Sequence, residues 1–121
     1  MKKTLIIGAS QNPERYANKA YLMLKSFGHQ TLLLGNKVGE IGTDSIVDNW
    51  SDLELDGVDA VTLYLGAKHQ LEYYDKIVKL KPNRVIFNPG TENEEFYRLL
   101  RTNDIAFEEA CTLVLLQTGQ Y

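Results

Sequence analysis

With 121 residues, 44% of them hydrophobic and 24% charged, the chain has the composition of one folded domain over residues 1–121 and needs no disulfides to complete its core. A net charge of −3 excludes a surface that attracts nucleic acid as a whole. No segment approaches the ~20 apolar residues that span a bilayer, and the N-terminus lacks the pattern of a secretory signal. We therefore expect a cytoplasmic protein without a membrane partner.

The first third of the chain predicts a strand, a helix and a second strand. Leu5 to Ile7 is a continuous apolar run, which is typical of a strand buried on both faces of a parallel sheet. Asn12 followed by Pro13 predicts a helix start, because Asn caps helices and Pro fits their first position. This helix ends at Gly28, and a second apolar strand follows over Thr31 to Leu34.

The middle of the chain combines a polar segment with two further strands. Residues 38–55 are rich in Gly, Asp, Ser and Asn, so we expect a loop with at most a weak helical turn near Ser51 to Leu53. The third strand is predicted over Ala60 to Leu65. A helix with apolar residues at helical spacing follows over about Lys68 to Leu80, and Arg84 to Phe87 is the fourth predicted strand.

The last third continues this alternation. Thr91 and Glu94 have the spacing of a capping box, which predicts a helix that runs to about Thr102. A short fifth strand is expected over Ile105 to Phe107. A terminal helix is expected over Cys111 to Gln117.

Strands and helices alternate without an Asn-Gly hairpin signal between consecutive strands. This order predicts an α/β, three-layer Rossmann-like fold in which helices cover both faces of a five-stranded, mostly parallel sheet. In such sheets ligands bind beyond the carboxyl ends of the strands. Four glycine-containing loops lie at that edge, namely residues 8–13, 35–39, 66–69 and 88–92.

The first of these loops, Gly8 to Pro13, has the features of a phosphate-binding turn. Unpaired backbone N–H groups converge there with the positive end of a helix dipole. Arg15 and Lys19 lie four residues apart on one face of the predicted helix, and like charges at this spacing are unfavourable unless an anion joins them. Two plainer explanations stay open: the small residues serve only close strand-to-helix packing, and the two cations lie on a solvated helix face.

The sequence offers little for catalysis. His69 has no nucleophile near it in the sequence. The single cysteine, Cys111, stands in an apolar segment, so we expect a buried core residue. Glu108 and Glu109 point to opposite faces of an extended segment, and we interpret them as a solvated turn. Without a metal-ligand cluster, a P-loop or a serine elbow, we expect neither an enzyme nor a metal site.

Motifs in a fixed order along nearly the whole chain resemble those of one family. They are GASxNPxR at residues 8–15, GEI at 39–41, VDAV at 58–61, NPGTENEE at 88–95 and ACTLVLLQTGQ at 110–120. Their order and spacing are similar to those of the small stand-alone CoA-binding proteins. These proteins are in turn similar to the N-terminal, Rossmann-like CoA-binding domain of the succinyl-CoA synthetase α subunit. The resemblance implies coenzyme A (CoA) or an acyl-CoA as the small-molecule ligand.

The resemblance also implies where this ligand lies. Its diphosphate would contact the first loop, and its adenine and ribose phosphate would lie between the second and third loops. The expected ligand-binding residues are Gly8, Ala9, Ser10, Asn12, Arg15, Lys19, Asn36, Lys37, Leu65, Gly66 and Lys68. Related sequences commonly have Asn-Pro at positions 36 and 37, and the lysine of this chain adds a cation there.

The resemblance implies binding without turnover. The synthetase reaction also needs a second domain with a phosphorylated histidine and a partner subunit for the nucleotide, and these 121 residues contain neither. Two other functions stay open. A minimal NAD(P)-dependent oxidoreductase is disfavoured, because Gly8 is the only glycine of a G-x-G-x-x-G fingerprint and Leu34 and Gly35 close the second strand in place of an acidic residue. The other is an interaction module with a vestigial nucleotide pocket, and Tyr and Leu residues late in the chain are candidates for a homodimer contact.

Overall fold

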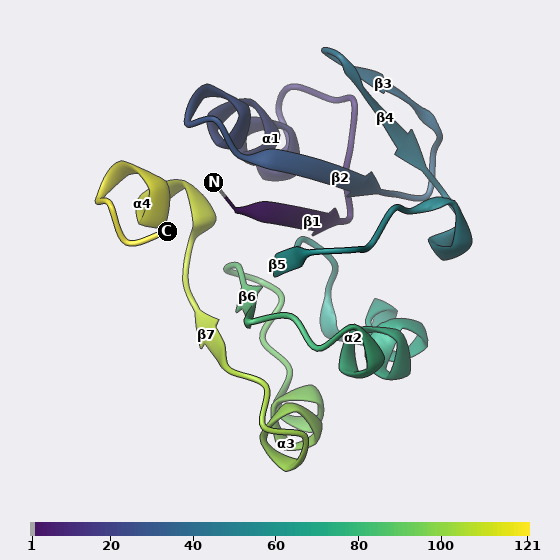
Figure 1. Ribbon diagram of the computed structural model, residues 1–121, viewed down its shortest axis with the longest axis vertical. Coiled ribbons are helices and arrows are strands. Elements are labelled where there is room, and N and C mark those ends of the chain that lie inside the picture. Colours follow the sequence, from purple (N-terminus) through teal and green to yellow (C-terminus); the bar gives the residue numbers. More distant parts are fainter. Residues whose placement is uncertain (1) are drawn as a thin grey trace.

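The centre of the fold is the strand Lys3–Ile7, which pairs with a strand on each side and is covered by helices on both faces. The computed structural model describes residues 2–121, and Figure 1 shows its arrangement of strands and helices. The strands are β1 (Lys3–Ile7), β2 (Gln30–Leu34), β3 (Gly39–Ile41), β4 (Asp44–Val47), β5 (Val58–Leu63), β6 (Arg84–Phe87) and β7 (Phe107–Glu109). Four of the five residues of β1 are buried, as its apolar run predicts.

One sheet contains these strands in the order β3-β4-β2-β1-β5-β6-β7. Its strands are paired in parallel except for β3 and β4, which form an antiparallel hairpin at one edge. The α/β, Rossmann-like class and the mostly parallel sheet are confirmed. The sheet is larger than expected, because the hairpin adds two strands to the predicted five.

Helices cover both faces of the sheet (Figure 1). They are α1 (Tyr16–Ser26), α2 (Tyr74–Leu80), α3 (Glu94–Thr102) and α4 (Thr112–Gln117). Ile6 faces α1 and α4 in one apolar cluster, whereas its neighbours Leu5 and Ile7 face α2 and α3 in the other. This alternation follows from the period of two along a strand. Within residues 2–121, no helix combines the length and apolar character that crossing a membrane requires.

The first helix begins later than the sequence predicts. Its first residue is Tyr16, and Arg15 before it has an extended backbone. The side chain of Asn12 does not cap this helix, because its Oδ1 atom accepts a hydrogen bond from the Glu14 amide within the preceding loop (3.0 Å). The prediction of a helix start at Pro13 was therefore wrong, and a longer loop joins β1 to α1.

The predicted loop over residues 38–55 contains the β3–β4 hairpin and a 3₁₀ turn. The turn, Trp50–Asp52, matches the weak helical turn that the sequence indicates near residues 51–53. A distant side chain anchors the hairpin: the Tyr21 hydroxyl lies 2.9 Å from the carbonyl oxygen of Ile41 and 2.7 Å from the carboxylate of Asp44. Because a helix residue supplies these bonds, local turn chemistry could not reveal the hairpin.

The segment between β5 and α2 also differs from the prediction. The strand ends at Leu63, so Tyr64 and Leu65 belong to the following loop. The helix expected from about Lys68 is broken into two 3₁₀ turns, residues 67–69 and 71–73, before α2 begins at Tyr74. The loop that follows the third predicted strand is therefore longer and contributes more side chains to this edge of the sheet.

The C-terminal third requires four smaller corrections. The cap of α3 is Asn93, whose side chain accepts a hydrogen bond from the Phe96 amide (3.2 Å), so the predicted capping box was wrong. The last strand lies two residues later than predicted. Glu108 and Glu109 belong to this strand and are not a solvated turn: Glu108 pairs with Arg84 at 2.9 Å, and Glu109 accepts a hydrogen bond from a tyrosine hydroxyl. Cys111 is half-buried and not a core residue, because it precedes α4 as its N-cap.

Candidate functional site

A cleft of about 1180 Å³ opens at the carboxyl edge of the sheet, beyond β1, β2 and β5. From β1 the chain runs through α1 to β2, toward one edge of the sheet. From β5 it runs through α2 to β6, toward the other edge. The two connections diverge, and such a switch point is where open α/β sheets bind ligands. The lining comes from three loop regions, within residues 8–17, 34–37 and 64–73.

The turn after β1 requires glycine. Gly8 has a φ of +97°, and a Cβ atom there would lie 3.0 Å from backbone atoms of Tyr64. The amides of Gly8 and Ala9 both donate to the carbonyl oxygen of Leu34, at 2.8 and 2.9 Å. These two amides therefore join β1 to the end of β2, and they are not free to hold a phosphate as the sequence suggests.

The free donors of this loop lie further along the chain. The amides of Tyr16 and Ala17, at the start of α1, have no hydrogen-bond acceptor within residues 2–121, and neither have those of Ser10 and Gln11. All four residues line the cleft. Free amides at a helix start bind anions, because the helix dipole adds to their partial charges. The structure thus moves the candidate anion site from Gly8 to the start of α1.

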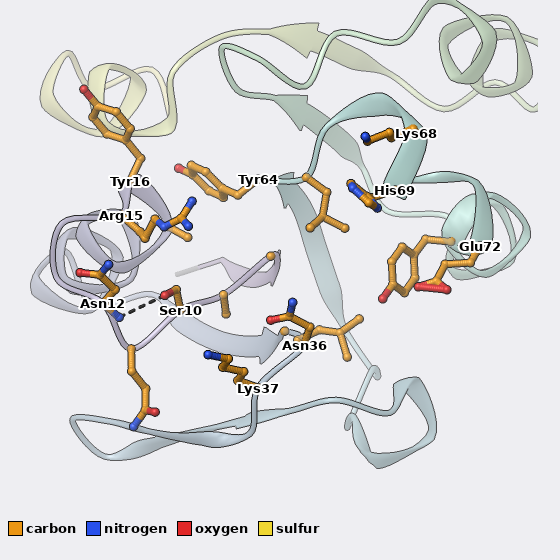
Figure 2. Close-up of a pocket in the computed structure, with 18 of the residues that line it drawn as sticks. Ser10, Asn12, Arg15, Tyr16, Asn36, Lys37, Tyr64, Lys68, His69 and Glu72 are labelled. Atoms are coloured by element: carbon orange, nitrogen blue, oxygen red, sulfur yellow. Dashed lines mark hydrogen bonds between the residues drawn. The ribbon is translucent and has the colours of Figure 1, made fainter.

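A buried asparagine holds this loop in place. The side chain of Asn18 is 4% exposed and donates a hydrogen bond to the carbonyl oxygen of Ser10 (3.0 Å). The Oγ atom of Ser10 in turn accepts a hydrogen bond from the Asn12 amide (3.1 Å; Figure 2). Asn18 was not predicted from the sequence, although a polar residue on the apolar face of a helix, between Ala17 and Tyr21, is a recognisable signal.

Three cations reach the cleft from three different loops. Arg15, Lys37 and Lys68 all line it and are exposed, and Figure 2 shows them around the same opening. The ion pairs within residues 2–121 are Lys25 with Asp44 and Arg84 with Glu108. None of the three cleft cations is therefore paired with a carboxylate. Unpaired cations around a concave site raise the local concentration of anions.

The expected ligand-binding residues all line the cleft except Lys19 and Gly66. Lys19 does not line it, and its ammonium group lies 5.2 Å from the ring centre of Tyr16. Gly66 precedes the first 3₁₀ turn of the third loop and has open space around it. The fourth loop, residues 88–92, was expected at the binding edge and does not line the cleft.

The fourth loop instead supports the third through buried amides. Asn88 donates to Thr62 Oγ1 (2.6 Å) and to the carbonyl oxygen of Leu63 (2.9 Å), and it accepts a hydrogen bond from the Thr112 amide (2.9 Å). It therefore joins the end of β5 to the start of α4. Because these groups are all buried, the network fixes one arrangement of the chain under the cleft.

A second buried amide, that of Gln70, completes this support. Its Nε2 atom donates to the carbonyl oxygens of Leu65 (2.9 Å) and Thr91 (2.8 Å), and its Oε1 atom accepts a hydrogen bond from Asn93 (2.9 Å). Gln70 is fully buried. The motif NPGTENEE therefore acts through packing and hydrogen bonds beneath the cleft wall.

Further residues line the cleft that the sequence did not predict as ligand contacts: Gln11, Glu14, Tyr16, Ala17, Leu34, Gly35, Tyr64, His69, Leu71, Glu72 and Tyr73. Most of them follow the strand ends by several residues, and the later helix starts bring them to the opening. Gln11 connects the cleft to the hairpin, because its amide donates to the carbonyl oxygen of Glu40 (3.0 Å).

Two tyrosines of the cleft wall stay protonated at neutral pH. Burial raises the pKa of Tyr64 to about 12, and its hydroxyl has no hydrogen-bond partner among residues 2–121. Burial, together with a hydrogen bond and negative charge from Glu72, raises the pKa of Tyr73 to about 12. Neither phenol is suited to accept a proton near pH 7. Free amides and cations therefore dominate the chemistry of the cleft, which favours an elongated ligand with several negative charges.

One protein-family model covers nearly the whole chain, and solved structures share its fold. A family model described as a CoA binding domain matches residues 2–117. No curated protein matches the chain. A crystal structure of an uncharacterized protein is 48% identical, with a TM-score of 0.94 over 100% of this chain and 98% of that chain.

Two further structures are more distant. A conserved hypothetical protein from Pyrococcus furiosus is 26% identical, with a TM-score of 0.80 over 94% of this chain and 99% of that chain. An acetyl-coenzyme A synthetase from Ca. Korarchaeum cryptofilum, in complex with phosphate and ADP, is 17% identical, with a TM-score of 0.73 over 89% of this chain and 25% of that chain. The last similarity shows a shared fold.

Proposed function

Because the chain belongs to the family of CoA-binding domains, as its motifs indicate, we propose that it binds CoA or an acyl-CoA across the cleft and catalyses no reaction by itself. The observation that carries this proposal is the convergence of Arg15, Lys37 and Lys68, unpaired and from three loops, on one opening. CoA carries a diphosphate and a separate ribose phosphate, so it presents negative charge at two points. Three separated cations match that distribution better than a single phosphate site would.

The diphosphate belongs at the start of α1 in this proposal. The free amides of Tyr16 and Ala17 supply fixed donors, and Arg15 supplies a charged one beside them. A charge-assisted hydrogen bond contributes about 1.5–3 kcal/mol, whereas the helix dipole adds only about 0.3–1 kcal/mol. Arg15 should therefore contribute more to affinity than the helix end itself.

The adenine and the ribose phosphate belong between the second and third loops. Asn36 offers an amide for hydrogen bonds, Leu65 offers apolar surface, and Lys37 and Lys68 offer charge on either side. The cleft volume of about 1180 Å³ lies slightly above the usual range of ~300–1,000 Å³ for small-molecule sites, which leaves room for a large ligand such as CoA.

Isothermal titration calorimetry with CoA tests this proposal through two cations of the same helix region. Arg15→Ala should weaken CoA binding by about 1–3 kcal/mol, or roughly 5- to 150-fold, because one charge-assisted contact is lost. Lys19→Ala is the matched control, since Lys19 does not line the cleft, and its affinity should stay within twofold of the wild type. Equal affinity of the Arg15 variant and the wild type would remove Arg15 from the site, and absence of CoA binding to the wild type would refute the proposal.

A cytoplasmic location and a homodimer stay predictions of the sequence.

A further inference from the structure

Two mostly exposed apolar side chains stand on opposite sides of the cleft. Tyr16, at the start of α1, and Leu71, in the turn before α2, are each 65% exposed, and both line the cleft. Figure 2 shows Tyr16 across the opening from His69 and Glu72, which lie close to Leu71 in the chain. A ligand that crosses the cleft can cover both side chains, because both line it.

Further apolar surface lies between these two side chains. The ring of Tyr64 and the side chain of Leu65 are half-buried and line the same cleft. In Figure 2 the Tyr64 ring lies between Tyr16 and His69. A ligand that crosses the cleft therefore meets apolar groups from the α1 side to the α2 side, although charges surround this path.

The charged side chains that line the cleft are of both signs. Arg15, Lys37 and Lys68 are the cations that the phosphates of CoA would engage. Each apolar side chain of the rim has a carboxylate close by in the chain, Glu14 near Tyr16 and Glu72 next to Leu71, and both carboxylates line the cleft. A carboxylate at the end of an acyl group would have to give up water to lie against the apolar side chains of the rim, and removing a charge from water costs free energy.

We propose that the cleft selects CoA thioesters whose acyl group is apolar and uncharged, and that Tyr16 and Leu71 contact this acyl group and the arm that carries it. This inference rests on the proposed CoA binding and adds the chemical class of the ligand to it. Burial of a methylene group contributes about 0.8 kcal/mol, which corresponds to roughly a fourfold gain in affinity. Affinity should therefore rise with acyl chain length until the apolar surface is covered.

The test compares the binding of CoA, acetyl-CoA, butyryl-CoA and succinyl-CoA to the wild-type chain by calorimetry. Butyryl-CoA has two methylene groups more than acetyl-CoA and should bind up to about 15-fold more tightly. Succinyl-CoA has the same number of acyl carbons as butyryl-CoA but ends in a carboxylate, and it should bind at least tenfold more weakly than butyryl-CoA. Equal affinities for butyryl-CoA and succinyl-CoA would overturn the inference. In that case binding of CoA itself would leave the proposed function intact, whereas no binding of any of the four compounds would refute both.

Two variants locate the acyl contact, and a third controls for surface changes. Tyr16→Ser and Leu71→Ser should each reduce the ratio of butyryl-CoA to acetyl-CoA affinity toward one, because the longer acyl group loses an apolar contact. Leu22→Ser changes another exposed apolar residue of α1, 54% exposed and outside the cleft, and the ratio should keep its wild-type value. A wild-type ratio in both the Tyr16 and Leu71 variants would refute the assignment of these side chains. Thermal unfolding of each variant verifies that it is folded.

Discussion

Two glycines of the cleft loops differ in the space around them, which predicts opposite effects of the same substitution. A Cβ atom on Gly35 would lie 2.5 Å from the carbonyl oxygen of Ala9 and 3.1 Å from the Ile46 side chain. Real Cβ atoms essentially never approach another heavy atom closer than 3.0 Å, so the backbone at Ala9 would have to move by about 0.5 Å. Gly66 has no atom within 4 Å of its Cβ position and no positive φ.

The cost of Gly35→Ala follows from what the displaced backbone holds. The amides of Gly8 and Ala9 both bind the carbonyl oxygen of Leu34, so a shift of Ala9 strains the junction between β1 and β2. Overpacking costs about 1–3 kcal/mol, and a weakened hydrogen bond adds about 0.5–1.5 kcal/mol. We expect the free energy of unfolding to fall by about 2–3 kcal/mol. For a chain of this length that corresponds to a melting temperature lower by roughly 8–12 °C.

Gly66→Ala should do the reverse, because an alanine there restricts the unfolded chain and meets no obstacle in the folded one. The expected gain is about 0.4–1 kcal/mol. Urea unfolding followed by circular dichroism, with calorimetry for the melting temperature, measures both variants. A Gly35→Ala variant within 0.5 kcal/mol of the wild type would refute the steric argument. So would a Gly66→Ala variant that is as unstable as the Gly35 variant.

Two further predictions concern buried polar groups. Asn88→Ala leaves the buried Thr112 amide without its acceptor and removes the hydrogen bonds from Asn88 to Thr62 Oγ1 and to the carbonyl oxygen of Leu63, so urea unfolding should show a loss of about 2–4 kcal/mol. Asn83→Ala removes an exposed amide and should cost less than about 1 kcal/mol, and equal losses would contradict the role of the buried network. Burial and nearby positive charge lower the pKa of His29 from its usual value of 6.5. Because the unfolded chain then binds the proton more readily, the contribution of His29 to stability is present above about pH 6.5 and is lost as the pH falls through its folded pKa. Calorimetry at a series of pH values should show a shallower loss of stability below pH 6.5 for His29→Gln than for the wild type, and an equal or steeper loss would contradict this linkage.

The sequence predicts the parts of the fold that local pattern determines. The apolar runs at Leu5–Ile7 and Val85–Phe87 mark strands of a buried parallel sheet, and the structure contains both. The β3–β4 hairpin could not be predicted in this way, because the hydroxyl of Tyr21 and the amide of Gln11, both distant in the chain, supply its anchoring bonds. Tertiary contacts of this kind leave no periodic signal in the segment that they hold.

In the candidate site, too, some residues could be placed from the sequence pattern and others depend on tertiary contacts. The rule that parallel strands end at one edge correctly brings Arg15, Lys37 and Lys68 to the same opening. Lys19 falls outside it, because α1 starts at Tyr16 and the side chain of Lys19 packs over the ring of that tyrosine. The role of Asn88 could not be read from its position after a strand, since an amide there suits a ligand contact as well as a buried hydrogen-bond network.

The central claim is that the cleft binds CoA and not a nicotinamide dinucleotide. Thermal unfolding in the presence of CoA, acetyl-CoA, NAD or NADP tests it most directly. A ligand at 100 times its dissociation constant stabilises the folded chain by about 2.7 kcal/mol, which is roughly 10 °C for a chain of this length. We expect such a shift with CoA and acetyl-CoA and none with NAD or NADP, and stabilisation by NAD or NADP alone would refute CoA binding as the function of the cleft.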